Sequence, residues 1–361
     1  MSIDKISADA RGLRERDLEV GASAETIARL HRGDVRDWFV DFARRYPTGL
    51  DAPGGGATRK RWETLTATAE RDLALGRLAE GHADALAIIA EVGDGVAVAV
   101  PGARWGVWAA EPPGSKLTAE RLDRGRWRVH GTRRWCSGAL ICTHALVTAD
   151  APDGPRLFTI DVGPPGYRVL PDSWPAIGMA ASETLDVELD AVAAEPVGEV
   201  GAYLDRPGFH HGGVGVAACW LGGARAVSRP LVEAAGRGRL DEHGLAHLGG
   251  VDLALTVGRT LLAQAAADID ADPLDRSGAA QVRALRVRAV VERTCAEVLE
   301  RVGRALGAGP LGHDARHARA VADLTVYIRQ HHAERDLARL GALRAAAVST
   351  EADGRRPEAT S

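Results

Sequence analysis

The spacing of apolar residues changes twice along this chain, and no other feature constrains the fold as much. From residue 9 to residue 92, apolar positions recur at helical spacing, as at Leu65, Ala69 and Leu73. Between about residues 96 and 196 the period becomes two, in short runs separated by Pro and Gly. The last third returns to helical spacing. Strands in the middle and helices at both ends predict an α+β chain with segregated helices and strands.

The length of 361 residues exceeds the size at which one hydrophobic core keeps growing, so several domains are expected. The changes of period predict a helical N-terminal domain at residues 1–95, a compact β-domain at 96–200 and a helical C-terminal domain at 201–348. Four helices are expected in the last domain, enough for an antiparallel bundle, at residues 211–236, 251–272, 282–306 and 317–343. Residues 349–361 are polar and lack an apolar stripe, so we expect a disordered tail there.

Composition favours a cytoplasmic enzyme. The net charge of −4 is mild and no basic stripe is present, which argues against a nucleic-acid partner. The longest apolar run, residues 212–224, is too short for membrane insertion. The N-terminal residues show no pattern of a secretory signal. No two of the four cysteines have C-x-x-C spacing, and they are expected to be reduced, mostly buried thiols: Cys136, Cys142, Cys219 and Cys295.

Residues 131–138 are the segment that points most directly to a ligand. They follow the turn signal of residues 123–125, and they read as the second arm of a β-hairpin. Trp135 precedes Ser137 by two positions, so alternation places an aromatic face and a hydroxyl on one side of the strand. Such a pair suits a planar heteroaromatic ligand, because the indole can stack and the hydroxyl can bond a ring heteroatom.

Four segments, in this order and at these separations, resemble the motifs of the acyl-CoA dehydrogenase superfamily of flavoproteins: residues 108–115, 131–138, 177–184 and 306–309. In that family the corresponding motifs are T-E-P-x-x-G-S, G-x-K-x-W-I-(S/T), M-G-x-x-(S/T) and a late G-G-x-G turn. The resemblance extends over about residues 60–343. It implies a helical N-terminal domain, a central β-barrel and a C-terminal four-helix bundle.

The resemblance also implies one FAD per subunit and an acyl thioester, or a related compound, as substrate. Against the isoalloxazine ring of the flavin would lie Trp135, Cys136 and Ser137. Ser115 would lie near the thioester end of a CoA-like ligand. A flavin of this kind accepts a hydride, while the protein supplies orientation and a base.

The family arrangement further implies assembly of subunits. The adenine half of FAD would be approached from a neighbouring subunit by Arg304, Gly307 and Gly309. A homodimer or homotetramer is therefore expected, with a hetero-oligomer as the alternative. The electron acceptor is left open between an electron-transfer flavoprotein and oxygen.

The chain departs from the family pattern at the catalytic base. The family threonine before Glu-Pro is Ala110, and residues 236–241 have no R-x-x-F-G segment. Counting from Asp323 and Tyr327, the place of the usual catalytic glutamate is taken by His331, and the alternative acidic position near residues 210–212 holds no carboxylate. Helical spacing points His331 inward unless the helix breaks first, and an imidazole can act as a base near neutral pH. A core histidine, or one that only bonds the flavin edge, is the alternative.

Two further pairs of histidines have the i, i+4 spacing of metal ligands: His243 with His247 and His313 with His317. Neither pair is followed by a Glu, and no third ligand is evident nearby. We therefore predict solvated or helix-end histidines and no metal site.

Three functions are compatible with these residues. The first is an FAD-dependent oxidoreductase that carries out α,β-dehydrogenation of an acyl thioester with an altered base, and it is the main prediction. The second is a flavin-dependent oxygenase or oxidase on the same fold. The third is a non-catalytic subunit that completes the site of an active paralogue.

Overall fold

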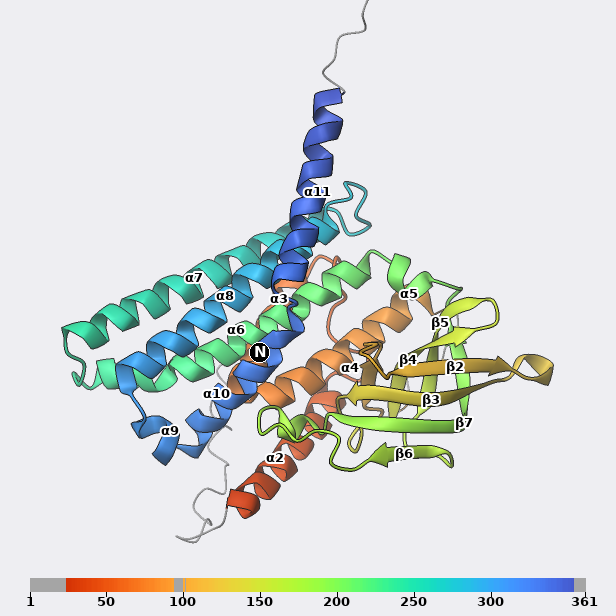
Figure 1. The fold of residues 1–361 in the computed structure, drawn as a ribbon, viewed down its shortest axis with the longest axis horizontal. Helices are drawn as coiled ribbons and strands as arrows, with labels where there is room; N and C mark the ends of the chain where they lie inside the picture. Colours follow the sequence, from red (N-terminus) through yellow and green to blue (C-terminus); the bar gives the residue numbers. More distant parts are fainter. Residues whose placement is uncertain (1–23, 94–99, 101, 354–361) are drawn as a thin grey trace, which may run out of the picture.

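A computed structural model describes residues 24–93, 100 and 102–353 of the chain (Figure 1). The first helices are α2 (Ala24–Arg45), α3 (Thr58–Arg71) and α4 (Leu73–Val92). The strands that follow are β1 (Trp105–Trp108), β2 (Lys116–Arg121), β3 (Trp127–Cys136), β4 (His144–Ala151), β5 (Gly154–Asp161), β6 (Tyr167–Leu170) and β7 (Leu185–Val197). The remaining helices are α5 (Ala202–Asp205), α6 (Gly208–Gly236), α7 (Glu242–Ala271), α8 (Ala280–Leu306), α9 (Gly309–His313), α10 (Ala315–Tyr327) and α11 (Glu334–Asp353). The predicted α+β class is confirmed.

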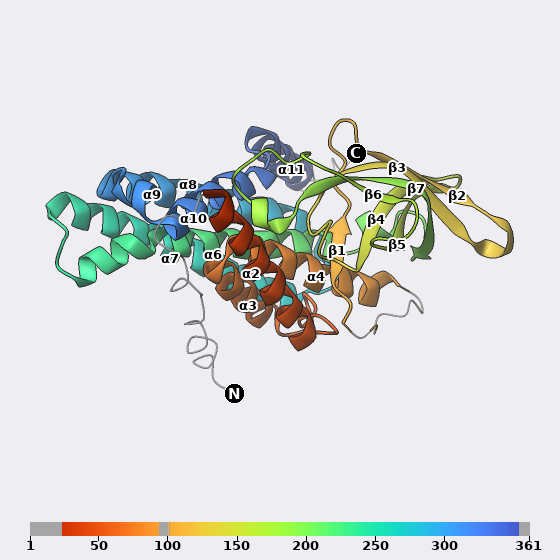
Figure 2. The same ribbon diagram turned by 90° about the horizontal axis from the view of Figure 1, so that it is seen from below.

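The strands form a closed barrel at one end of the molecule (Figure 2). β3 pairs antiparallel with β2 and β7, β7 pairs with β5, and β5 pairs with β4. The ring closes where β4 meets β2 in a parallel pair at Thr118 and Asp150. β1 and β6 are attached outside this ring, to β4 and β7. Alternate side chains such as Val129, Phe158 and Val187 are fully buried and form the barrel core.

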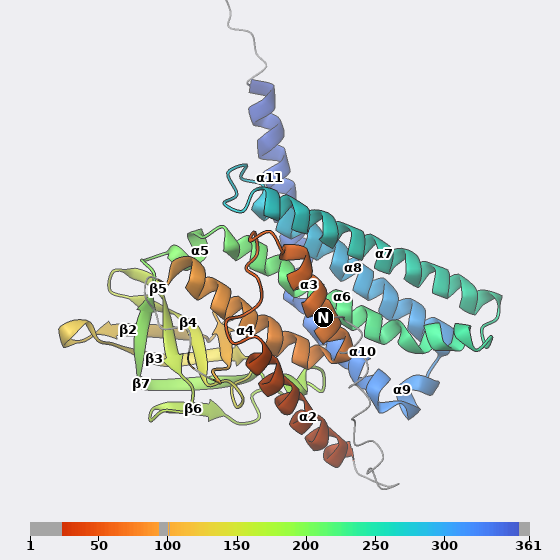
Figure 3. The ribbon, with the colours of Figure 1, turned by 180° about the vertical axis from the view of Figure 1, so that it is seen from behind.

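The first three described helices divide between two hydrophobic cores. Val35 and Phe39 of α2 and Leu78 of α4 pack with the barrel interior. Trp62 and Leu65 of α3 instead pack in one core with α6, α7 and α8. Seen from behind, α3 and α4 therefore lie between the barrel and the long C-terminal helices (Figure 3).

The contact between α3 and α6 depends on a glycine. A Cβ atom on Gly222 would lie 2.3 Å from the carbonyl oxygen of Thr66, so the two helix backbones approach too closely for any side chain there. The Thr66 hydroxyl donates to the carbonyl of Ala218 at 3.0 Å across the same contact. This approach fixes the position of α6, the helix around which the C-terminal domain is built.

The segment expected as one helix at residues 317–343 is instead broken into α10 and α11. A short 3₁₀ turn, Ile328–Gln330, follows α10. Ala333 then adopts a left-handed backbone with φ of 46°, and Asp336 accepts the His332 N–H at 3.0 Å. The Asp336 carboxylate thus satisfies a backbone donor that a continuous helix would have bonded internally.

Helix α11 projects away from the body of the molecule and continues to Asp353 (Figure 1). Residues 349–353, expected in a disordered tail, are therefore helical. The Ala-rich stretch of residues 345–347 gives a physical reason, because high intrinsic helix propensity can extend a helix without an apolar stripe. Residues 354–361 lie outside the described part of the chain. No described helix combines the length and apolar character needed to cross a bilayer.

Candidate functional site

Strand β3 ends in an irregular segment at Trp135. The pairing of β3 with β7 shifts register between Arg133 and Cys136, and Trp135 has a left-handed backbone with φ of 61°. The backbone N–H of Trp135 donates to Asp186 Oδ1 at 3.1 Å, while the residue is 49% exposed. The shift in register breaks the regular alternation that the sequence argument assumed for Trp135 and Ser137. Strained backbone that holds an exposed aromatic ring is typical of a functional site.

A chain of hydroxyl groups fixes the hydrogen-bonding role of Ser137. The Ser182 hydroxyl donates to the carbonyl of Met179 at 2.7 Å, so its single proton is used. In the 2.7 Å contact between Ser182 and Thr184, Thr184 must therefore donate. In the 2.9 Å contact between Thr184 and Ser137, Ser137 must donate in turn. Ser137 is left with lone pairs alone, and it can offer a ligand only an acceptor.

The turn that carries Ser137 is bonded on both sides. The Ser137 carbonyl accepts from Trp108 Nε1 at 2.9 Å, and the Gly138 N–H donates to the Ser182 carbonyl at 2.8 Å. Cys136, in contrast, is fully buried in the barrel core, where its thiol donates to the Arg133 carbonyl at 3.4 Å. Burial raises the pKa of the Cys136 thiol well above its usual value. The four cysteines are all buried and unbridged, as expected.

Ser115 is tied to the same end of β3. Its hydroxyl accepts the Arg134 N–H at 3.2 Å, and its own N–H donates to the Pro112 carbonyl at 2.9 Å. The Arg134 guanidinium bonds the Pro113 carbonyl at 2.9 Å and Asp186 at 3.0 Å. The structure therefore brings Ser115, Trp135 and Ser137 to one end of the barrel.

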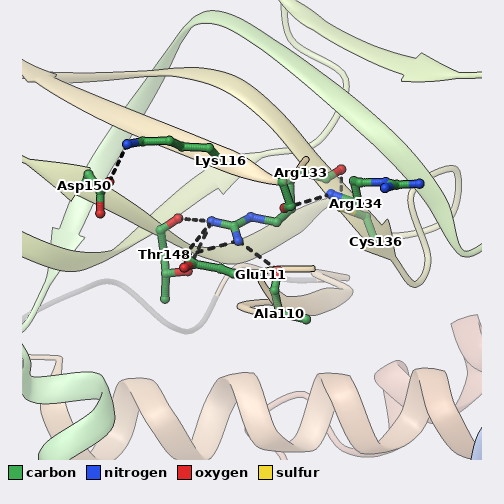
Figure 4. A network of polar contacts seen from close by, with 9 residues as sticks. Ala110, Glu111, Lys116, Arg133, Arg134, Cys136, Thr148 and Asp150 are labelled. Atoms are coloured by element: carbon green, nitrogen blue, oxygen red, sulfur yellow. Dashed lines mark hydrogen bonds and ion pairs between the residues drawn. The ribbon is translucent and has the colours of Figure 1, made fainter. Parts of the chain in front are cut away.

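A buried arginine holds the loop before Ser115 in place (Figure 4). The Arg133 guanidinium is fully buried and donates to the Ala110 carbonyl at 2.8 Å and to Thr148. Glu111 lies 3.4 Å away and is the only carboxylate that an ion pair joins to it in the described chain. Burial is the largest influence on the Arg133 pKa and lowers it. Sequence reasoning gave Arg133 no role, although it lies only two residues before Trp135.

His331 is buried, with charged groups near it, after the break in the helix. Its Nδ1 atom lies 3.2 Å from Asp336 Oδ2, an ion-pair distance without hydrogen-bond geometry. Arg288 lies beside it and donates to the carbonyls of Gln330 at 2.8 Å and Gly213 at 2.7 Å. Burial lowers the pKa of His331, opposed by Asp336 and assisted by Arg288. Within the described chain, no hydrogen bond or ion pair joins His331 to Ser115, Trp135 or Ser137.

The residues expected near the adenine half of FAD lie at the opposite end of α8. Arg304 is separated from Arg288, beside His331, by about 24 Å of helix at 1.5 Å per residue. Its guanidinium is exposed and pairs with Glu300 at 2.7 Å. Gly307 ends α8 with a φ of 63°, and Gly309 begins α9. These residues cannot share a site with His331 in one subunit, so their expected role requires a second subunit.

The structure also contains a cleft that the sequence analysis did not foresee. It has a volume of about 1010 Å³ and is walled by α2, the turn between α3 and α4, α6 and the α9–α10 segment. Elements more than 250 residues apart in the sequence meet here, as His31 and Asp323 do. No local sequence pattern could have revealed it.

Two carboxyl groups lie at the base of this cleft. Asp72 Oδ2 is 2.6 Å from His31 Nε2, and Asp72 Oδ1 accepts the Leu75 N–H at 3.0 Å. Burial raises the pKa of Asp72, but the contacts with His31 and Leu75 outweigh burial and lower the pKa overall. Asp323 accepts the Met179 N–H at 2.5 Å, and burial, reinforced by Asp72, raises its pKa to about 7. Asp323 thereby joins α10 to the loop that carries the hydroxyl chain.

The histidine pairs do not form part of a metal site in the described residues. No group of three or more His, Cys, Asp or Glu side chains there has the arrangement to hold a metal ion. His313 Nδ1 bonds the carbonyl of Gly309 at 3.1 Å, and His317 lies buried in the wall of the cleft.

Comparison with known proteins finds a relative that matches part of the sequence. No protein-family model matches the sequence. An amino sugar nitrososynthase, RubN8 of Streptomyces rubradiris, is 30% identical over 242 residues, which cover 55% of this chain and 54% of that protein. The match thus spans about half the length of this curated relative.

Solved structures resemble the whole fold. TdsC of Paenibacillus sp. A11-2, with FMN and indole, has a TM-score of 0.72 at 19% identity over 87% of this chain and 94% of that one. KijD3, with FMN and a dTDP-amino-keto sugar, has a TM-score of 0.71 at 19% identity over 92% and 93%. A glutaryl-CoA dehydrogenase of Mycobacterium smegmatis, with FADH2, has a TM-score of 0.66 at 15% identity over 87% and 92%. The chain has the acyl-CoA dehydrogenase fold, as its motifs implied.

Proposed function

We propose that this protein is a flavin-dependent oxygenase, which uses reduced flavin and oxygen to oxidise a small organic substrate. The observation that carries the proposal is the hydroxyl chain that makes Ser137 an acceptor. Reduced flavin bears a ring N–H where oxidised flavin bears a lone pair, so an acceptor favours the reduced form. The names of RubN8 and TdsC, a nitrososynthase and a dibenzothiophene monooxygenase, support the same class of reaction.

The residues at the end of β3 fit a flavin ring. Trp135 offers a half-exposed indole on a strained backbone that Asp186 holds, and flat heteroaromatic rings stack on such a surface. Ser137 lies two residues further along, in a turn with bonds on both sides. Ser115 has a hydroxyl that retains bonding capacity beyond its contact with Arg134.

The chain's own contribution is to place and shape this surface. Bound flavin would supply the redox chemistry, accepting hydride or, when reduced, activating oxygen. Trp135 would orient the ring, and Ser137 would accept a hydrogen bond from it. Arg133 holds the loop at Ala110 and Arg134 holds Pro113, so the walls of the surface are set before any ligand arrives. No carboxylate is needed at the two positions where dehydrogenases of this fold carry their base.

A second candidate is dehydrogenation of an acyl thioester with His331 as the base. The specific observation in its favour is that the Asp336 carboxylate lies 3.2 Å from Nδ1 of a buried imidazole, an arrangement in which a proton on Nδ1 would face the carboxylate and Nε2 would be the nitrogen to take a proton. The lowered pKa of His331 keeps that nitrogen unprotonated at neutral pH. On this second candidate, FAD would be the cofactor and the adenine half would be held by Arg304, Gly307 and Gly309 of a partner subunit.

The test begins with the absorption spectrum of the purified protein after incubation with FAD or FMN. We expect a bound flavin, and we expect Trp135→Ala to weaken its binding by about 3- to 10-fold, since aromatic contacts contribute about 0.5–1.5 kcal/mol beyond burial. Unchanged thermal unfolding of the variant would show that the fold is retained. Failure to bind either flavin would contradict both candidates and favour a non-catalytic subunit of a hetero-oligomer.

The second step separates the two candidates. Protein with bound flavin is reduced without substrate, and oxygen consumption is then followed with a panel of amines, sulfides and indoles. In parallel, oxidised protein is titrated anaerobically with a panel of acyl thioesters. Oxygen-dependent product supports the oxygenase. Bleaching of the flavin by a thioester supports the dehydrogenase and contradicts our first proposal.

A further inference from the structure

A pair of carboxyl groups is buried inside the molecule, where α4 packs against α6 and α10. Glu80 of α4 is 4% exposed, and the Arg77 guanidinium donates a hydrogen bond to its Oε2 atom. Asp84 lies one turn further along α4, accepts from the buried Arg61 at 2.5 Å and forms a side-chain hydrogen bond with Glu80. Two carboxyl groups can bond to each other only if they share a proton. The pair can therefore hold one proton away from water.

Burial gives Glu80 the properties of an acid at neutral pH. Burial is the largest influence on Glu80 and raises its pKa to about 8, with Arg77 opposing this shift and Asp84 adding to it. A carboxyl group with this pKa is mostly protonated at pH 7 and can release and regain its proton there. The groups on α5, α6, α8 and α10 on which Glu80 acts electrostatically are Tyr203, Cys219, Arg288 and Tyr327.

A buried hydroxyl group without a partner lies near this pair. Tyr327 of α10 is 3% exposed, and its hydroxyl makes no hydrogen bond within the described chain. Glu80 is the largest charged influence on this hydroxyl, and Tyr327 acts in turn on Arg77. The Tyr327 ring packs edge-on against Trp220, with 6.3 Å between the ring centroids. Buried polar atoms are almost always satisfied, so a free hydroxyl beside a protonated carboxyl indicates a role in proton transfer.

The pair lies between Ser137 and His331. Arg77, which holds Glu80, lines a narrow space between α4 and β1 together with Ser137. Tyr327 stands four residues before His331. Neither end of this path supplies an acid, because Ser137 can offer a ligand only an acceptor and the lowered pKa of His331 leaves it unprotonated at neutral pH.

We propose that Glu80 and Tyr327 form a proton relay that serves the flavin site. This inference rests on the proposed function, in which anionic reduced flavin gives two electrons to oxygen and the bond between the two oxygen atoms breaks. One oxygen atom bonds to the substrate, and the other becomes water by taking the flavin proton and one further proton. Glu80 gives its proton to the Tyr327 oxygen as the Tyr327 proton leaves for that water. Arg77 stabilises the carboxylate that remains, and a proton from solvent restores Glu80.

The first measurement asks whether Glu80 holds a proton, and it needs neither flavin nor substrate. Infrared spectra of the full chain at pH 7 should show the carbonyl band of a protonated carboxyl group that Glu80→Gln lacks. Raising the pH should remove this band with a midpoint near 8. Glu70→Gln is the matched control, because Arg225 binds that carboxylate at 3.0 Å on α3, and it should keep the band. Identical spectra of the wild type and Glu80→Gln would overturn the proposal.

The second measurement follows the proton during reaction. Bound flavin is reduced and mixed with oxygen without substrate, so that hydrogen peroxide forms and the same single proton is required. The oxidised flavin absorption should return about a hundredfold more slowly in Glu80→Gln, a typical general-acid contribution, and Glu80→Asp should recover part of the rate. The wild-type rate should fall as pH rises through about 8, since the acid must be protonated, and Glu80→Gln should lose this dependence.

Tyr327→Phe separates the relay from a structural role. Removing an unbonded buried hydroxyl should leave thermal unfolding unchanged or raise its midpoint, whereas the relay requires reoxidation of the flavin to slow. Equal reoxidation rates in the wild type, Glu80→Gln and Tyr327→Phe would overturn the relay and leave the proposed function standing. A wild type that binds no flavin would overturn both.

Discussion

The imidazole of His331 lies 3.2 Å from the Asp336 carboxylate, and the Arg288 guanidinium acts on it as a nearby cation. If His331 removes a proton from substrate, His331→Ala should lower turnover about a hundredfold, a typical general-base contribution. His332→Ala is the control, because that side chain is 54% exposed and contacts the same carboxylate only at 3.5 Å. Full activity of His331→Ala in a thioester assay would exclude it as the base.

The pH profile provides a separate measurement on the same residue. A base works when unprotonated, so turnover should rise with pH and reach its plateau above the His331 pKa. Because burial lowers that pKa, the midpoint should fall below the usual 6.5 of imidazole. Asp336 raises the pKa, so Asp336→Asn should move the midpoint to lower pH still. A midpoint above 7 would contradict this account.

The chain of hydroxyl groups formed by Ser182, Thr184 and Ser137 should affect how tightly flavin binds, and this can be tested apart from activity. Ser182→Ala removes the acceptor that orders the chain, so Thr184 can donate to Ser137 and Ser137 recovers a proton to donate. The preference for reduced over oxidised flavin should then fall about 2- to 10-fold, as expected for one hydrogen bond of about 0.5–1.5 kcal/mol. Dissociation constants for both redox states measure it. Ser228→Ala, a buried serine remote on α6, is the control.

At the scale of elements, the contact between α3 and α6 can be tested with two glycines of the same helix. Gly222→Ala places a methyl group 2.3 Å from the Thr66 carbonyl, and it should lower the free energy of unfolding by about 1–3 kcal/mol, as overpacking does. Gly213→Ala meets nothing within 4 Å and should raise that free energy by up to about 1 kcal/mol, because alanine favours a helix. Urea unfolding measures both. Equal effects of the two changes would contradict a close approach of α3 and α6 at Gly222.

The hydrogen bond from the Met179 N–H to the buried Asp323 of α10 should make the stability of the fold depend on pH. Asp323 has a folded-state pKa of about 7, raised from 3.8. Between these values the unfolded chain loses a proton that the folded chain keeps, so stability should fall as pH rises from about 4 to about 7. Asp323→Asn keeps an acceptor for the Met179 N–H, and it should flatten this slope and increase stability at pH 8. Asp123→Asn, on an exposed turn, should leave the slope unchanged.

At the scale of the whole molecule, α7 presents apolar side chains to the outside. Leu245, Leu253 and Val257 are 53%, 65% and 47% exposed, and they share one face of the helix. We expect a second subunit to cover this face, so light scattering should give at least twice the 38.1 kDa of one chain. Leu253→Lys with Val257→Lys should yield monomers, whereas Leu274→Lys, also exposed, should not. A monomeric wild type would contradict the expectation that Arg304 approaches the FAD of a neighbouring subunit.

Local patterns in the sequence determined most of the elements and the end of the barrel that carries Trp135. Hydrophobic period separates helix from strand without knowledge of tertiary contacts, and Gly307 marks the end of α8 by local backbone chemistry. The motif around Trp135 could be recognised because its spacing is short. The same local reasoning was wrong where a tertiary contact or a weak helix propensity decided the local structure, as at the break before His331 and at the helical residues 349–353.

Only the tertiary structure decided which groups act together. Whether the Ser137 hydroxyl can donate or only accept a hydrogen bond from a ligand depends on Ser182 and Met179, more than 40 residues away. The direction of a hydroxyl hydrogen bond can be assigned only once its acceptor is placed. The raised pKa of Asp323 depends on burial, and burial cannot be read from the residues next to Asp323 in the sequence. The cleft with its arginines joins α2, α6 and α10, whose closeness results from packing around a shared core. Periodicity is local in the chain, whereas desolvation and charge are properties of three-dimensional neighbours.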